Sequence, residues 1–198
     1  MILYTLMLNK IELNFPNILT IARIALIPLF AIIFYLPFDL ARPMCALLFA
    51  IAGITDWLDG YLARKMNLVS KFGEFLDPVA DKLLVSIALV LLVSTDTAYI
   101  LVLPACIIIG REIMVSALRH WVALANEAAT LDVTYIAKVK TFSQFAALVL
   151  LLYQDSYLGV PLYEIGIILL YIATILTVIS LVRYISQTIS NNNDEGNY

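Results

Sequence analysis

Residues 56–81 read DWLDGYLARKMNLVSKFGEFLDPVAD and lie between two long apolar runs. Eight of these residues are charged, although only 14% of the 198-residue chain is charged. Asp56 and Asp59 are spaced i, i+3 and Asp77 and Asp81 are spaced i, i+4, so each pair lies on one face of a helix. The connection between the pairs is short, which makes the two helices antiparallel neighbours. We therefore expect the four carboxylates to converge.

The runs on either side of this stretch indicate a membrane protein. Hydrophobic residues make up 63% of the chain, whereas a soluble domain is nearer 45–50% apolar and about 25% charged. The excess must face lipid, which excludes a soluble enzyme, a disordered chain, a collagen-like chain and a disulfide scaffold. A span needs about 20 apolar residues, and the chain offers six, at about 17–36, 43–59, 77–94, 98–118, 135–153 and 160–184.

The predicted fold is an all-α integral membrane protein of six transmembrane helices and a short N-terminal interfacial helix. Residues 1–15 are amphipathic and form the interfacial segment, residues 16–186 form one membrane domain, and residues 187–198 form a polar tail that we expect to be disordered. Eleven of the twelve Lys and Arg lie on one side of the predicted spans. That bias places both termini and the aspartates in the cytoplasm. No basic face suggests nucleic-acid binding.

The four aspartates predict a metal site. Carboxylates gathered at a membrane boundary repel one another and resist desolvation. Mg²⁺ or Mn²⁺ removes both problems, and four carboxylates suit two ions about 3.5–4 Å apart, an arrangement used for phosphoryl displacement. A diphosphate substrate follows. An ordinary helix-end role explains one aspartate better than four, and a carboxylate-based cation transporter would carry them near the bilayer midplane.

Three other residues of this stretch suit a phosphate ligand, each with a plainer alternative. Gly60 permits close backbone approach to a ligand or ends the helix as a C-cap. Arg64 offers a bidentate fork to phosphate or anchors the cytoplasmic side. Ser70 offers a hydroxyl donor or is an ordinary loop serine.

The same stretch matches the pattern D-x2-D-G-x2-A-R-x8-G-x3-D-x3-D at all eight fixed positions. It thereby resembles the CDP-alcohol phosphotransferase family. The resemblance implies a six-helix membrane enzyme, usually a homodimer, with a cytoplasm-facing cavity. Such an enzyme moves a phosphatidyl or similar group from a CDP-linked donor to an alcohol and releases CMP.

The resemblance also implies residue roles. Asp56, Asp59 and Asp77 would ligate the metals, while Asp81 would help to hold the second metal and act as general base. The CDP part of the donor would contact residues from two segments of the chain: Gly60, Arg64 and Ser70 of the motif, and Asn17, Thr20 and Arg23, which resemble an N-x2-T-x2-R element of the first helix. Without the resemblance, Asn17 and Thr20 are typical helix-start residues and Arg23 a residue that snorkels to the interface.

Basic residues elsewhere suggest an acceptor that carries phosphate. Arg111 lies well inside the fourth predicted span, where an arginine is costly and indicates function. Neighbouring Glu112 is expected to neutralise it only indirectly, because adjacent helical residues point about 100° apart. The predicted anion pocket comprises Arg111, Arg119, Lys138, Lys140 and Arg183. Anchoring to the cytoplasmic side is an alternative for the last three.

Segments outside the motif, including REIMVSALR and AKVKT, resemble the bacterial branch of the family that uses glycerol 3-phosphate. This resemblance implies CDP-diacylglycerol as donor, glycerol 3-phosphate as acceptor and the bacterial inner membrane as location. A related enzyme using inositol phosphate, serine or phosphatidylglycerol is the alternative within the family.

Overall fold

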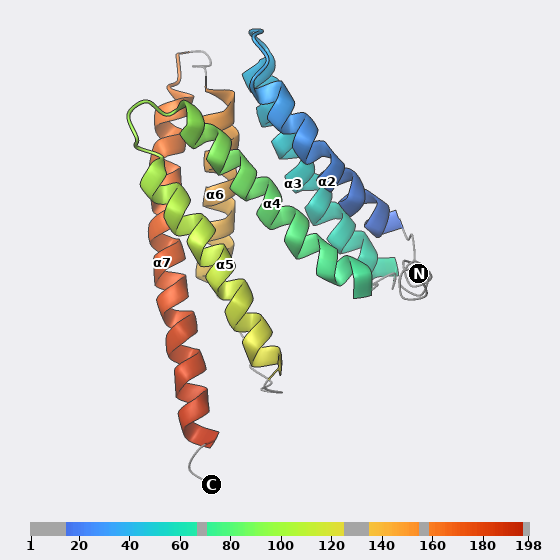
Figure 1. Cartoon of the computed structure of the whole chain (residues 1–198), viewed down its shortest axis with the longest axis vertical. Helices are drawn as coiled ribbons and strands as arrows, with labels where there is room; N and C mark the ends of the chain where they lie inside the picture. The colour runs from blue at the N-terminus through green and yellow to red at the C-terminus, as the bar shows by residue number, and fades with distance from the viewer. Residues whose placement is uncertain (1–14, 67–70, 125–134, 155–158, 196–198) are drawn as a thin grey trace, which may run out of the picture. The chain divides into compact units, whose positions relative to one another are not determined.

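The computed structural model describes residues 15–66, 71–124, 135–154 and 159–195. Within these ranges the chain forms six helices: α2 (Phe15–Phe34), α3 (Ala41–Met66), α4 (Lys71–Thr95), α5 (Val102–Leu124), α6 (Tyr135–Tyr153) and α7 (Leu162–Glu195) (Figure 1). They divide into two units, residues 1–91 and 92–198, and each unit is described by itself. The predicted interfacial segment at 1–15 lies outside the described residues except for Phe15, which begins α2.

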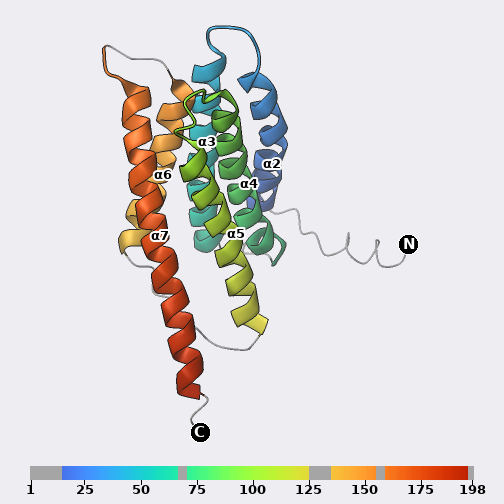
Figure 2. The same ribbon diagram turned by 60° about the vertical axis from the view of Figure 1, so that its left-hand side comes forward.

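In the first unit, α2 packs along α3, and the two helices lie side by side in both views (Figures 1 and 2). Phe30 of α2 and Phe49 of α3 are each 1% exposed, and their ring centroids are 6.5 Å apart. The guanidinium carbon of Arg42 lies 3.7 Å from the ring centroid of Phe34, a cation–π contact at the start of α3. This antiparallel packing brings the first turns of α2 beside the carboxyl-terminal part of α3, where the motif begins.

The second unit is built on α7, against which both α6 and α5 pack. Leu148, Leu151 and Leu170 are fully buried in this core. Gly166 lets α6 and α7 approach closely, because a Cβ atom there would lie 2.9 Å from Cγ of Leu151. This packing fixes the face of α6 that carries Lys140.

A turn that Asp96 stabilises precedes α5, which begins later than the predicted span start at residue 98. The carboxylate of Asp96 accepts hydrogen bonds from the backbone N–H of Ala98 at 3.2 Å and of Leu101 at 2.6 Å. Between them Tyr99 has φ of 58°, a left-handed conformation typical of turns. The chain therefore turns at this point, and α5 begins at Val102.

The helices that carry the motif are longer than hydropathy suggests. Helix α3 runs through Met66, past the predicted span end at residue 59, and α4 begins at Lys71, before residue 77. Once a helix is formed, each added residue gains a backbone hydrogen bond whatever its polarity. Gly60 therefore lies inside α3, and the alternative that it is a C-cap is wrong.

Helix α7 also extends beyond its predicted end. It continues through Glu195, so residues 187–195, which we expected to belong to a disordered tail, are helical. The polar residues Ser, Gln and Asn are only moderately unfavourable in a helix, and propagation from the packed part of α7 outweighs that cost. Residues 196–198 lie outside the described part of the chain.

The described helices differ in how apolar they are. In the described ranges two helices are long and apolar enough to cross a bilayer, at Asn17–Phe34 and Leu162–Ser186, and Val139–Tyr153 is a shorter apolar helix. Ile32 of α2 and Val182 of α7 are about 60% exposed, and large apolar residues are exposed on both helices. The other helices combine apolar residues with charges such as Asp56, Asp81 and Arg111, so length and composition alone leave the span count at two.

Candidate active site

The motif occupies the two helices that flank residues 67–70. Asp56, Asp59, Gly60 and Arg64 lie on the carboxyl-terminal part of α3, and Asp77 and Asp81 lie on α4. The side chains of Asp56, Asp77 and Asp81 are described, whereas those of Asp59 and Arg64 are not. Ser70 lies outside the described residues, so its predicted donor contact stays a prediction.

Helix α2 supplies three buried polar residues to this site. Asn17, Thr20 and Arg23 are 1–2% exposed. Their i, i+3, i+6 spacing keeps them along one side of the helix. Buried polar groups in native proteins are hydrogen-bonded, so these three side chains must face partners on neighbouring helices. The alternative that Asn17 and Thr20 serve only as helix-start residues does not account for their burial.

Arg23 joins the two helices of the motif. Its Nη1 donates to Oδ1 of Asp56 at 2.6 Å and to Oδ1 of Asp81 at 3.2 Å. The Arg23 side chain is 1% exposed, whereas those of Asp56 and Asp81 are 32% and 46% exposed. An arginine that snorkels would keep its guanidinium at the interface, so that interpretation of Arg23 is wrong. The guanidinium of Arg23 instead contacts both Asp56 of α3 and Asp81 of α4.

Thr20 holds the third described aspartate. Its hydroxyl donates to Oδ1 of Asp77 at 2.5 Å. One helix face of α2 therefore organises three carboxylates that are up to 25 positions apart in the chain. The sequence predicted that these carboxylates gather, but not that α2 holds them.

The charges of these side chains would attract a divalent cation, although the three described carboxylates do not form a group that could hold a metal ion. Asp56, Asp77 and Asp81 bring three negative charges and Arg23 brings one positive charge, which leaves a formal excess of two negative charges among these groups. Carboxylate oxygens are the ligands that Mg²⁺ and Mn²⁺ favour. A divalent cation would balance the charge that Arg23 leaves uncompensated.

Four convergent carboxylates stay a prediction. Among the residues whose side chains are described, no group of three or more His, Cys, Asp or Glu could hold a metal ion. The side chain of Asp59 lies outside the described part of the chain, so the preceding statement does not cover it. Arg23 and Thr20 engage the other three carboxylates, so each aspartate turns at least one oxygen toward α2.

A second charged cluster lies in the other unit, on α5 and α6. Arg111 Nη1 donates to Oε1 of Glu112 at 2.6 Å, and Lys140 Nζ lies 3.5 Å from the same oxygen. The expectation that Glu112 cannot contact Arg111 directly is therefore wrong. The separation of about 100° applies to the directions in which neighbouring side chains leave the helix, and these two chains are long enough to bend together.

The other predicted acceptor residues are only partly placed. Arg183 lies on α7 and is exposed. Arg119 lies on α5 and Lys138 on α6, but their side chains are outside the described part of the structure. Of the five cations, the structure therefore brings Arg111 and Lys140 together at Glu112. Arg183 is exposed and takes no part in these two ion pairs, and the placement of the other two side chains stays a prediction.

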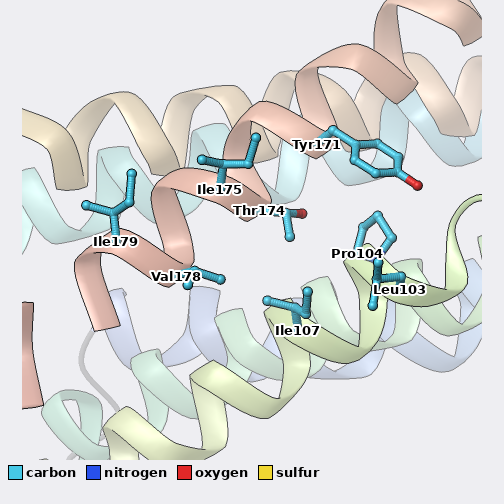
Figure 3. A pocket seen from close by; sticks show the side chains of 8 residues that line it. All are labelled: Leu103, Pro104, Ile107, Tyr171, Thr174, Ile175, Val178 and Ile179. Atoms are coloured by element: carbon cyan, nitrogen blue, oxygen red, sulfur yellow. The ribbon is translucent and has the colours of Figure 1, made fainter. Parts of the chain in front are cut away.

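Sequence reasoning missed two features of this second cluster. Glu112 joins the two cations, and Gln144, one turn after Lys140 on α6, is only 7% exposed. The i, i+4 spacing of Lys140 and Gln144 in an apolar helix was the sequence pattern that could have predicted a polar face on this helix. A separate apolar cavity of about 320 Å³ lies between α5 and α7, where Ile107 of α5 lies opposite Thr174 and Val178 of α7 (Figure 3). It contains none of the predicted site residues.

Comparison with known proteins identifies the family. Residues 13–179 match the CDP-alcohol phosphatidyltransferase family, and the chain belongs to it. The family resemblance drawn from residues 56–81 is thus confirmed. Because the members are transferases, the cation-transporter alternative is not supported.

Similar bacterial proteins carry one name, CDP-diacylglycerol–glycerol-3-phosphate 3-phosphatidyltransferase. The protein of Salmonella typhimurium is 45% identical over 175 residues, which cover 88% of this chain and 94% of that protein. The protein of Pectobacterium atrosepticum is 45% identical with the same coverage. The protein of Haemophilus influenzae is 47% identical over 88% of this chain and 92% of its own length.

Proposed function

We propose that this chain transfers the phosphatidyl group of CDP-diacylglycerol to glycerol 3-phosphate, giving phosphatidylglycerophosphate and CMP. The observation that carries the proposal is the contact of Arg23 with both Asp56 and Asp81, which joins the two halves of the family motif. The printed names of relatives at 45–47% identity support the choice of donor and acceptor.

Asp81 is proposed as the general base. Its side chain is 46% exposed, so an acceptor hydroxyl can reach it, and one of its oxygens accepts from Arg23. Asp81 takes the proton of the acceptor hydroxyl, and the hydroxyl oxygen attacks the β-phosphorus of the donor. A new oxygen–phosphorus bond forms, the bond to the CMP oxygen breaks, and CMP leaves with that electron pair. This direct displacement needs no covalent enzyme intermediate.

The residues proposed to hold the metal are Asp56, Asp59, Asp77 and Asp81, with Mg²⁺ or Mn²⁺ as the ion and two ions as the expected number. When bound, divalent cations supply charge neutralisation for the diphosphate and for the departing CMP. Arg23 and Thr20 keep the carboxylates oriented by direct hydrogen bonds.

The remaining motif residues are proposed to bind the donor. Gly60, Arg64 and Ser70 would contact the CDP part. Asn17, Thr20 and Arg23 are proposed to line the nucleotide pocket. Because these residues are only 1–2% exposed, we propose that Thr20 and Arg23 act on the donor mainly through the carboxylates that they hold.

The acceptor phosphate is proposed to bind basic residues of the second unit. Arg111 is half-buried, Lys140 is buried, and both contact the carboxylate of Glu112. An arginine in such a place suits a dianionic ligand, because its guanidinium offers a fork of N–H donors. Arg119, Lys138 and Arg183 are proposed as further members of this pocket.

The membrane arrangement is also part of the proposal. We place six spans in the bacterial inner membrane, with both termini and the aspartates on the cytoplasmic side, and we expect a homodimer. The apolar helices α2, α6 and α7 and the eleven-to-one distribution of Lys and Arg support the spans and their orientation.

An acceptor panel tests the substrate assignment. Purified protein is supplied with CDP-diacylglycerol and, separately, glycerol 3-phosphate, inositol phosphate, serine or phosphatidylglycerol, and CMP release is measured. We expect glycerol 3-phosphate to give at least about tenfold higher kcat/KM than any other acceptor, since its phosphate meets buried cations. Turnover of serine without turnover of glycerol 3-phosphate would overturn the assignment.

A further inference from the structure

Glu112 of α5 lies between two cations, Arg111 of α5 and Lys140 of α6. Its Oε1 is 2.6 Å from Arg111 Nη1 and 3.5 Å from Lys140 Nζ. The side chains of Arg111, Lys140 and Glu112 are 13%, 7% and 21% exposed. One carboxylate oxygen therefore fixes the positions of two cations that belong to different helices.

One hydrogen-bond donor of this cluster is left without an acceptor. Arg111 Nε is buried and has no acceptor within the described part of the chain. A buried donor without an acceptor is unfavourable, and an incoming anion can satisfy it. Arginine presents its five N–H groups in one plane, so holding Nη1 also sets the direction of Nε.

We propose that Glu112 is a positioning residue for the acceptor phosphate, because it holds Arg111 and Lys140 in the arrangement that receives the anion. The inference rests on the proposed function and adds a residue to it. Glu112 itself does not touch the phosphate, since two anions repel. Without the carboxylate, Arg111 and Lys140 repel each other and the guanidinium loses its fixed plane.

The test separates acceptor binding from chemistry. Glu112→Gln removes the charge and keeps the size of the side chain. We expect KM for glycerol 3-phosphate to rise about tenfold, with kcat and KM for CDP-diacylglycerol within about twofold of wild type. Glu112→Asp keeps the charge and should restore KM to within about threefold of wild type. Glu164→Gln, at an exposed glutamate in the first turn of α7, is the matched control and should behave as wild type.

Two results would overturn the inference: an unchanged KM for glycerol 3-phosphate in Glu112→Gln, or an effect confined to kcat or to KM for CDP-diacylglycerol. If Glu112→Gln does not fold, Glu112→Ala, which also removes the carboxylate, decides through inhibition by inorganic phosphate. The inhibition constant of phosphate should then rise in parallel with KM for glycerol 3-phosphate, and an unchanged constant would contradict the proposal. A wild-type protein that turns over no glycerol 3-phosphate would instead overturn the proposed function.

Discussion

Asp81→Asn should lower kcat by about a thousandfold while Kd for CDP-diacylglycerol changes less than about threefold. A positioned general base contributes about 10²–10⁴ in rate, and an amide cannot take the proton of the acceptor. Asparagine keeps an oxygen that can accept from Arg23, as Asp81 Oδ1 does at 3.2 Å. CMP release by purified protein gives kcat, and equilibrium binding of the donor gives Kd.

Asp39→Asn is the matched control for this substitution. Asp39 is exposed in the connection between α2 and α3, so the same loss of charge there should leave kcat within about twofold of wild type. Near-normal turnover of Asp81→Asn would contradict the assignment of Asp81 as the base. An equal loss in both variants would mean that charge, and not the position of Asp81, matters.

Arg23→Met should lower kcat/KM about a hundredfold and lower Tm by about 3 °C. Methionine keeps an apolar stem but removes the cation that contacts both Asp56 and Asp81. The two carboxylates then repel each other and move apart. The stability effect is modest because Asp56 and Asp81 are 32% and 46% exposed, so solvent screens part of their repulsion. Steady-state CMP release and a thermal melt of the same preparation measure the two effects.

Arg23→Lys separates charge from shape in this prediction. Lysine keeps the positive charge but lacks the rigid fork of the guanidinium, so we expect about a tenfold loss in kcat/KM and little change in Tm. If Arg23→Met retains more than about half of wild-type activity, the arginine does not organise the carboxylates. If both variants lose kcat/KM equally, the planar fork of the guanidinium is required and the positive charge alone is not sufficient.

The helices were predictable from apolar runs, but their ends were not. Hydropathy marks where apolar residues stop, whereas a helix continues as long as backbone hydrogen bonds propagate. Helices α3 and α7 therefore reach Met66 and Glu195, beyond the apolar residues. At α5 the difference has the opposite sign, because a turn that Asp96 stabilises precedes the helix, which begins at Val102.

The site was predictable where spacing carries the information. The motif in α3 and α4 identified Asp56, Asp77 and Asp81, and the family match confirms the resemblance that the motif supported. The contacts of Arg23 with Asp56 and Asp81 and of Thr20 with Asp77 were not predictable, because they depend on how α2 packs against the motif helices. The pairing of Arg111 with Glu112 was missed for another reason: helical spacing describes where side chains start, not where long ones end.

The most direct test of the account is CMP release from CDP-diacylglycerol by the purified chain, with glycerol 3-phosphate as the only acceptor. The excess of negative charge at Asp56, Asp77 and Asp81 predicts that release requires Mg²⁺ or Mn²⁺ and stops when a chelator is added. One CMP is expected for each phosphatidylglycerophosphate formed, and no CMP is expected without acceptor. Release that continues in the chelator, or that does not depend on glycerol 3-phosphate, would contradict it.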